Sequence, residues 1–444
     1  MTKQFDWQCQ PEAQKWLNSL LEGFKAKNGA IAHLEKHLRT QASTRLFDWI
    51  DHFTIDASVA TEQEIERVGF VQQITMPSYR VFSHPGAQFP AVLVRDASCK
   101  HPLGVAVRVE SVADFLMVHR LEKVIEGSLF SPYRRCLIEK TEDVALLCVE
   151  RRSSRTMEPV YQTESAIDEY LTVLERLQGR SRDSMSQTFS LIEEIVSSIG
   201  KDAAAWAFLE VERKYWQARN LAAQLQKNRQ DSVGMGWANH DHHTFCSSRK
   251  NFAPLVRFFE TLGFHCRERF YAGNQAGWGA QVMENPTCGL ILFLDVDLAP
   301  QELEVDFAHH PLAELDKLTT VGLWCALHGD SILEAGMHHL EAQFMFDKLK
   351  EDLAAHHMGM MDPFSNFPYL KQAFTAGQIW PVDPPRVEAL RTAGLITPAQ
   401  AEYFLTNGAL GSHLENLQRD EGYKGFNKDN VSLIIQRTDP RVAV

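Results

Sequence analysis

The sequence predicts an α+β fold assembled from repeated strand-helix-strands modules. Short segments of β-branched and aromatic residues are each followed by an amphipathic helix and then by further strands, which is the pattern of an α+β domain. A proline-free helical stretch separates an early set of such segments from a later set. Twelve of the 18 histidines lie from His240 onward, on or near the later strands. Together these observations predict two strand-rich regions, of which the second is chemically specialised.

The first region, residues 1–160, is predicted to be an N-terminal α+β module. Leucines at helical spacing predict one helix over residues 11–40, residues 47–55 form a strand, and residues 61–67 begin a helix. His52 lies on the first strand, but no histidine follows on a matching strand, so we interpret this module as a degenerate copy of the later ones. Further strands are predicted at residues 73–75, 79–82, 91–94, 105–109 and 144–149.

Residues 161–235 are predicted to be a helical connector. Residues 162–228 contain no proline and few glycines, and long helical patterns run over 167–177 and 203–225. The polar run between these patterns is expected to separate two helices.

The third region, residues 236–444, repeats the strand-helix-strands pattern twice. A strand at 242–245 precedes a helix over residues 252–262 that ends at Gly263. With the first region this gives three units, which indicates an internal structural repeat. The later elements are strands at 267–271, 280–283, 290–294, 337–344 and 369–374, a helix at 347–355, and a last strand at 431–436.

Composition excludes several classes of protein. The 444 residues carry a net charge of −12 and no basic stripe, which argues against nucleic acid as a partner. No run of about 18 apolar residues predicts a membrane span, and residues 1–6 contain no apolar signal core. The eight cysteines form no CxxC motif, so we expect a reducing, cytoplasmic location. Nothing in the pattern indicates an oligomeric state.

Adjacent histidines on predicted strands are typical of a metal site. Neighbours on a strand face opposite sides, so one imidazole of His242-His243 and one of His338-His339 faces inward in any register. A third segment, residues 412–419, contains Glu415 two residues after a histidine. Two imidazoles and one carboxylate form a facial site with open positions, which suits Fe(II) or Mn(II). The alternative is that these histidines are only structural.

The third region resembles the vicinal oxygen chelate superfamily, and specifically the iron-dependent 2-oxoadipate dioxygenase/decarboxylases. Residues 242–245 with the following helix resemble the first ligand strand of that family, and Met337-His338-His339-Leu340 resembles the second. Residues 367–372 resemble its Pro-Ile-Leu-Leu-Arg-Gln strand. Residues 415–419 resemble its Glu-Ile-Glu-Gln-Arg segment, which provides the ligand glutamate. The resemblance covers roughly residues 236–437 and implies strand-helix-strands modules that form a cupped mixed sheet around one metal.

The resemblance implies that His242, His339 and Glu415 hold the metal, with His243 as the alternative first ligand. The family has a substrate-binding arginine four residues after its first ligand, where this chain has Cys246. Its two ligand histidines are also separated by more residues than here. A cationic clamp for the substrate could instead come from Arg249, Arg267 or Lys371. On predicted strands, Gln281 and Gln372 could donate hydrogen bonds to substrate, or be ordinary sheet-edge residues.

By resemblance, the protein is expected to be a non-haem Fe(II)-dependent dioxygenase/decarboxylase. It would convert a 2-oxo acid similar to 2-oxoadipate to a 2-hydroxy acid, with consumption of O2 and loss of CO2. The expected cofactor is Fe(II), although the sequence does not distinguish it from another divalent metal. Two alternatives stay open: an O2-independent metal isomerase, lyase or hydrolase on the same scaffold, and a non-enzymatic protein that binds a small ligand.

Overall fold

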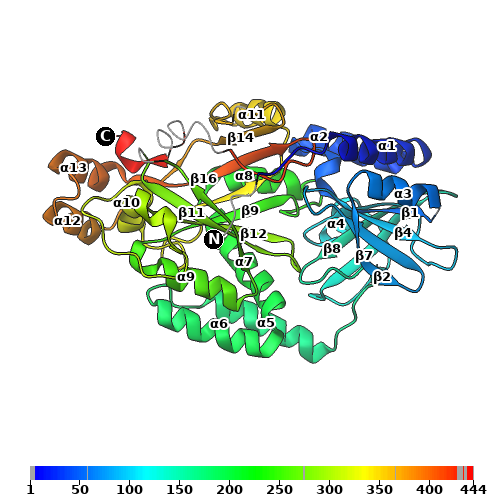
Figure 1. The fold of residues 1–444 in the computed structure, drawn as a ribbon, viewed down its shortest axis with the longest axis horizontal. Helices are drawn as coiled ribbons and strands as arrows, with labels where there is room; N and C mark the ends of the chain where they lie inside the picture. Colours follow the sequence, from blue (N-terminus) through cyan, green and yellow to red (C-terminus); the bar gives the residue numbers. More distant parts are fainter. Residues whose placement is uncertain are drawn as a thin grey trace.

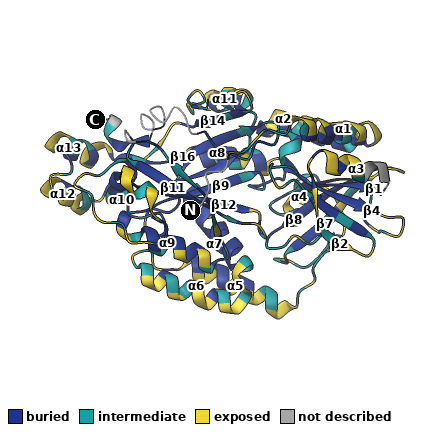
Figure 2. Ribbon diagram, viewed as in Figure 1, coloured by how far each residue is buried: buried dark blue, intermediate teal, exposed yellow. Residues whose placement is uncertain are grey.

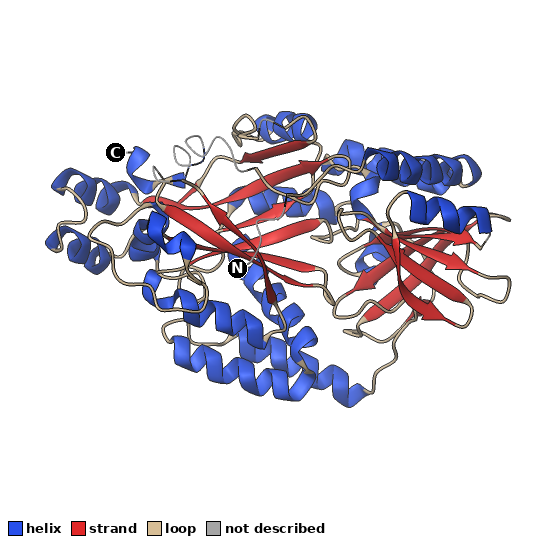
Figure 3. Cartoon of the chain, in the orientation of Figure 1, coloured by secondary structure: helices blue, strands red, loops and turns tan. Residues whose placement is uncertain are grey.

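The chain forms two mixed β-sheets joined by a helical segment, as Figures 1 and 3 show. The computed structural model describes residues 6–57, 59–273, 276–365, 367–427, 434 and 438–443. Both sheets curl and are covered by helices, so the predicted α+β fold of strand-helix-strands modules in mixed sheets is confirmed. Residues 1–6, for which we expected no signal core, lie mostly outside the described residues.

Two antiparallel helices precede the first sheet. Helix α1 (Pro11–Lys27) and helix α2 (Gly29–Ala42) replace the single predicted helix over residues 11–40. The break occurs at Asn28, whose extended backbone ends α1 and whose side chain accepts a hydrogen bond from the backbone N–H of Ala30. This is an N-cap, and an asparagine between two amphipathic stretches was its signal in the sequence. A short 3-10 helix, η1 (Leu46–Trp49), occupies the start of the predicted strand over 47–55.

The first sheet has the strand order β2-β3-β4-β1-β5-β8-β7-β6 and contains two modules. In each module the first strand pairs in parallel with the last, as β1 does with β4 and β5 with β8. We predicted one module here, because β7 has charged residues on both faces, which hid its strand character, and α4 is short. The elements are β1 (Ile50–Asp56), α3 (Val59–Arg67), β2 (Val71–Met76), β3 (Tyr79–Ser83), β4 (Ala91–Arg95), β5 (Gly104–Arg108), α4 (Val112–Val118), β6 (Ile125–Glu126), β7 (Tyr133–Lys140) and β8 (Ala145–Arg151).

Four helices connect the two sheets, where the pattern predicted two. They are α5 (Glu164–Gln178), α6 (Met185–Ile199), α7 (Lys201–Gln217) and α8 (Leu221–Asp231). Gly200 has a positive φ of 81° and separates α6 from α7. The side chains of Thr163, Ser184 and Asn220 cap the N-termini of α5, α6 and α8, respectively. These helices pack on the outer face of the second sheet.

The second sheet repeats the topology of the first, with the order β10-β11-β12-β9-β13-β16-β14. Together the described residues therefore contain four modules, one more than predicted. The expected strand over residues 431–436 lies mostly outside the described residues. The elements are β9 (His240–Cys246), α9 (Arg249–Thr261), β10 (His265–Tyr271), β11 (Trp278–Asn285), β12 (Leu290–Asp297), η2 (Pro300–Glu304), α10 (Thr320–His328), β13 (His339–Ala342), α11 (Phe346–Ala355), β14 (Leu370–Phe374), β15 (Gln378–Trp380), α12 (Pro384–Thr392), α13 (Pro398–Asn407), β16 (Ala409–Arg419) and η3 (Pro440–Ala443).

The two faces of the second sheet differ in chemistry. Leucines and phenylalanines on the outer face pack against α7, α9 and α11 in the largest apolar core of the protein. The inner face is also buried, as Figure 2 shows for β9, β12 and β16, but it bears histidines, carboxylates and aromatic rings. Helix α10 lies over this face. None of the described helices is both long and apolar enough to cross a bilayer.

Candidate metal centre

Strand alternation brings His242 of the first pair toward the cavity on the inner face, and both histidines of the second pair, His338 and His339, line that cavity. On β9, His242, Thr244 and Cys246 line this cavity. His243 points to the outer face, where its Nε2 lies 3.1 Å from Nη1 of Arg213 on α7. Of these two histidines, which the sequence left as alternatives, only His242 faces the cavity.

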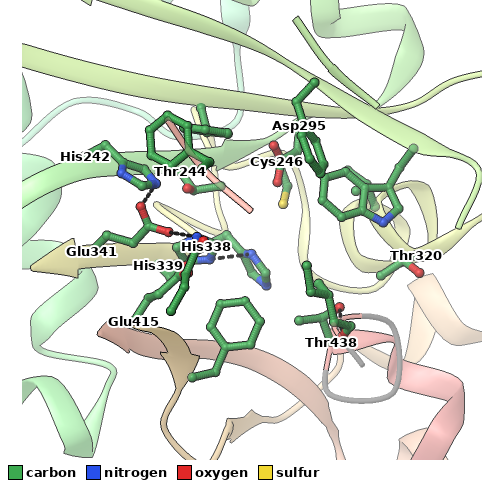
Figure 4. Close-up of a pocket in the computed structure, with 18 of the residues that line it drawn as sticks. His242, Thr244, Cys246, Asp295, Thr320, His338, His339, Glu341, Glu415 and Thr438 are labelled. Carbon is green, nitrogen blue, oxygen red and sulfur yellow. Dashed lines mark hydrogen bonds and ion pairs between the residues drawn. The ribbon is translucent and has the colours of Figure 1, made fainter. Parts of the chain in front are cut away.

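The neighbouring strands place three more ligand-type side chains beside His242. On β13, His339 and Glu341 are two residues apart and share the inner face. In the sheet register Glu341 lies opposite His242 on one side and opposite Glu415 of β16 on the other. Two imidazoles and two carboxylates from three adjacent strands therefore converge at one point (Figure 4).

The four side chains contact one another in sequence: His242 contacts Glu341, Glu341 contacts Glu415, and Glu415 contacts His339. Glu341 forms an ion pair with Nε2 of His242, and Nε2 of His339 lies 3.1 Å from Glu415 Oε2. Gln372 on β14 donates from its amide nitrogen to Glu415 Oε1 at 2.8 Å and to Glu341 Oε1 at 3.4 Å. All of these residues are at most 7% exposed. The cluster is thus sealed within the protein and aligned by an amide from a fourth strand.

His242 is oriented by an ion pair behind it. Its Nδ1 donates to Asp241 Oδ1 at 3.0 Å, which leaves Nε2 free to face the cluster. Arg419 donates to both carboxylate oxygens of Asp241, at 3.1 Å each, and Gln88 from the first region donates to Asp241 at 2.9 Å. A carboxylate that fixes the tautomer of a histidine in this way is a common support for a metal ligand. We call Asp241 and Arg419 the rear ion pair.

Burial shifts the pKa of each member of the cluster toward its neutral form. Burial raises the pKa of Glu341 well above its ordinary value, and the neighbouring Glu415 raises it further. Burial also raises the pKa of Glu415. It lowers the pKa of His242 to about 4 and that of His339 to about 3, so both imidazoles are neutral at physiological pH. Neutral imidazoles are the form that binds metal.

The cluster has the donor set of a divalent-metal site. Within the described residues, the ion-pair partners of Glu341 and Glu415 are histidines, and no lysine or arginine neutralises either carboxylate. Two buried carboxylates without a cation are strongly disfavoured unless they take up protons or a metal. Nitrogen and oxygen donors in equal number suit Fe(II), Mn(II) or Zn(II). His242, His339, Glu341 and Glu415 therefore fit such an ion.

The cluster of His242, His339, Glu341 and Glu415 forms one end of a cavity between the inner face of the second sheet and helix α10. Its walls combine aromatic rings with polar side chains, and Thr244, Asp295, Thr320 and Thr438 are among the polar residues, as Figure 4 shows. No lysine or arginine occurs among the described lining residues. The aromatic lining comprises Phe270, Trp278, Phe293, Trp324, Phe364, Phe374 and Phe426.

The predicted substrate-binding residues are dispersed. Gln372 lines the cavity and contacts the metal cluster. Arg249 is buried at the start of α9, where it forms an ion pair with Glu302. Gln281 donates within its own sheet to the carbonyls of Glu268 and Val282, and Lys371 pairs with Asp347 on the opposite side of β14. Arg267, the other candidate clamp, pairs with Glu268 and Glu284.

Two cavity carboxyls were missed in the sequence. Glu341 follows His339 by two residues, so the same alternation argument that selected the histidines could have placed it on the inner face. Asp295 lies at the end of the apolar strand β12, where nothing in the local pattern distinguishes it from Asp297. Only the pairing of β12 with β9 brings Asp295 next to Cys246.

Comparisons with known proteins do not assign a family. No protein-family model and no curated protein matches the chain. Among solved structures, the chain is similar to a 4-hydroxymandelate synthase mutant from Streptomyces coelicolor, with 11% identity, coverage of 89% of this chain and 98% of that one, and a TM-score of 0.24. It is also similar to a Mn(II)-bound glyoxalase from Novosphingobium aromaticivorans (9% identity, 86% and 85% coverage, TM-score 0.20) and to a methylmalonyl-CoA epimerase from Mycobacterium tuberculosis (9%, 41% and 89%, 0.24). At these TM-scores the similarities support no conclusion about activity.

Proposed function

We propose that the protein is a non-haem Fe(II)-dependent dioxygenase/decarboxylase that converts a 2-oxo acid to the 2-hydroxy acid one carbon shorter. The observation that supports this proposal is the group of His242, His339 and Glu415, buried without a compensating cation at the end of an aromatic cavity. The overall reaction consumes one O2 and releases one CO2 per 2-oxo acid. When bound, Fe(II) supplies chelation of the 2-oxo acid and activation of O2.

The protein's own residues would hold and shield the reacting groups. Asp241 fixes the tautomer of His242, and Gln372 holds Glu415 by a hydrogen bond of 2.8 Å. The aromatic walls exclude water from the reacting end, which strengthens electrostatic interactions there. In this proposal Glu341 stays outside the coordination sphere as a hydrogen-bond partner of Gln372. Three coordination positions are then open to substrate and O2.

A second candidate function follows from Glu341 itself. If Glu341 is a fourth protein ligand, an octahedral ion keeps only two open positions. A 2-oxo acid could still chelate the ion, but O2 would have no position beside it. Such a site suits a metal-dependent isomerase, lyase or hydrolase, in which the ion acts as a Lewis acid. The contact between Glu341 and His242 Nε2 favours this alternative.

Oxygen dependence separates the two functions. Protein reconstituted anaerobically with Fe(II) is offered a set of 2-oxo acids, and O2 uptake and CO2 release are measured with and without air. The dioxygenase predicts equimolar O2 uptake and CO2 release that stop under anaerobiosis. Turnover that is unchanged without O2 would support the alternative function and contradict the first.

The Glu341→Gln variant is the matched test of the same question. Glutamine keeps the size of the side chain and its contact with Gln372 but is a poor metal ligand. The dioxygenase proposal expects Fe(II) affinity within about threefold of wild type, because three strong ligands remain. A fall of more than about 10-fold, together with O2-independent turnover in wild type, would assign Glu341 as a ligand.

A further inference from the structure

Asp295 is a buried carboxyl group that faces the cavity without a partner. It lies on β12 beside Cys246 of β9 and is 6% exposed. Its backbone carbonyl accepts a hydrogen bond from Ser247 N. Within the described part of the chain its side chain makes no ion pair, and its buried Oδ1 has no hydrogen-bond partner. Figure 4 shows it across the cavity from Glu415.

Other buried carboxylates of this protein have partners. Asp241 pairs with Arg419, Asp51 with Arg151, and Glu212 with Arg180. Asp297, two residues after Asp295, accepts hydrogen bonds from the backbone N–H groups of Thr319 and Gly322. Buried polar groups are almost always satisfied, so an exception that faces a cavity indicates a ligand. The ligand group that satisfies Asp295 must donate a hydrogen bond or carry positive charge.

The other residues that line the cavity also favour a ligand group that donates a hydrogen bond or carries positive charge. The lining contains Glu341, Glu415 and Asp295, and no lysine or arginine among its described members. A divalent ion would offset the two glutamates, which leaves Asp295 as the acidic group at the opposite end of the cavity. Trp278 and Trp324 also line the cavity, and indole rings favour cationic or aromatic ligands. A substrate carboxylate at this end would find no lysine or arginine among the described lining residues to neutralise it.

We propose that Asp295 determines specificity by binding a hydroxyl or ammonium group at the end of the substrate remote from the metal. The inference rests on the proposed function, because it assumes that the other end is a 2-oxo acid held at the metal cluster. It excludes dicarboxylic substrates such as 2-oxoadipate. Hydroxyl and ammonium groups share one property: each can donate a hydrogen bond to the carboxyl group of Asp295.

The test measures binding of four matched probes to the Fe(II)-loaded protein under anaerobic conditions, by calorimetry. The probes are phenylpyruvate and its para-hydroxymethyl, para-aminomethyl and para-carboxy derivatives. We expect the hydroxymethyl or aminomethyl probe to bind at least 10-fold tighter than phenylpyruvate, and the carboxy probe to bind weakest. Equal affinities, or tightest binding of the carboxy probe, would overturn the role of Asp295. No binding of any probe would instead contradict the proposed 2-oxo acid function.

Two variants identify the group that Asp295 prefers. Asp295→Asn keeps a hydrogen-bond acceptor without charge, so it should lose a preference for the ammonium probe but retain one for the hydroxyl probe. Asp295→Leu should lose both. Metal content and the thermal midpoint serve as controls for folding, and removal of an unsatisfied carboxyl should leave the midpoint unchanged or raise it. If both variants fold and bind the four probes with the same relative affinities as wild type, the proposal is contradicted. If a variant does not fold, the relative affinities measured on the wild-type protein still test the proposal.

Discussion

The first and second sheets have the same topology and the same support for one histidine, yet among the described residues only the second sheet has a cluster of two histidines and two carboxylates. His52 on β1 donates to Asp51 at 2.8 Å, and Asp51 pairs with Arg151 at 2.7 Å. This arrangement repeats His242, Asp241 and Arg419 of the second sheet. The strand registers match as well, since His52 lies opposite Ala106 where His242 lies opposite Glu341.

The difference between the sheets is at the ligand positions. By register, Gly104, Ala106 and Leu147 of the first sheet occupy the places of His339, Glu341 and Glu415. None of these three side chains can bind a metal. Ala106 and Leu147 instead pack with Tyr133 and Val149 in a small apolar core. The first sheet therefore has the same fold and a matching ion pair behind its histidine, but apolar packing occupies the positions of the cluster.

This comparison shows which features indicate a metal and which indicate only the fold. The Asp–His–Arg arrangement occurs in both sheets, so it stabilises the module and is not by itself a sign of a metal. The distinguishing feature is the pair of carboxylates, Glu341 and Glu415, without a cation. We therefore expect metal binding to respond to substitutions in the second sheet and not to matched substitutions in the first.

The largest expected effect is from loss of a ligand. His339→Ala removes one imidazole from the cluster and should weaken Fe(II) binding by more than about 100-fold, as measured by anaerobic metal titration. Leu147→Ala, in the first sheet, is the matched control and should leave Fe(II) affinity within about twofold of wild type. Equal losses in the two variants would mean that folding, and not coordination, controls the titration.

Breaking the ion pair behind His242 should weaken metal binding more than breaking the matching pair behind His52, but by a smaller factor than loss of a ligand. Asp241→Asn removes the charge that orients His242 and should weaken metal binding by about 10- to 100-fold. Asp51→Asn makes the same change behind His52 and should leave metal affinity within about twofold, although it too breaks a buried ion pair. Metal titration of both folded variants measures the contrast. The comparison fails if Asp51→Asn weakens metal binding as much as Asp241→Asn does.

Acidification should reveal the structural role of the pair in the first sheet. Although burial opposes it, Arg151 holds the pKa of Asp51 well below its ordinary value. A lowered pKa in the folded state contributes stability above the unfolded pKa of about 3.9, and this contribution falls as the pH drops below that value. The stability lost in Asp51→Asn should therefore be smaller at pH 3 than at pH 7 by about 1 kcal/mol, in urea unfolding. An equal loss at both pH values would contradict the ionised pair.

The smallest effect is expected at Lys371, on the solvent side of β14. Lys371 pairs with Asp347 outside the cavity. Lys371→Ala should change neither metal affinity nor substrate KM by more than about twofold, because exposed ion pairs contribute little. Gln372→Ala, one residue later and inside the cavity, is its matched comparison and should weaken metal binding through Glu415. A large effect of Lys371→Ala on KM would restore it as a substrate clamp.

Local patterns predicted those features that strand alternation determines. Adjacent histidines on short strands predicted an inward imidazole from each pair, and the family resemblance selected the residues that face the cavity, His242 and His339. Long-range pairing determined the rest. Glu341 becomes part of the cluster because β13 lies between β9 and β16, and Asp295 enters the cavity because β12 pairs with β9. The second module of the first sheet was missed because β7 has charged residues on both faces and α4 is short.

The most direct test of the contrast between the sheets is to locate bound metal. Crystals grown anaerobically with Fe(II) are measured at the iron absorption edge, where anomalous scattering locates the ion. The account predicts one anomalous peak per chain, within about 2.3 Å of His242, His339 and Glu415, and none beside His52. A peak at His52, or a protein saturated with Fe(II) without a peak at the cluster of the second sheet, would contradict it.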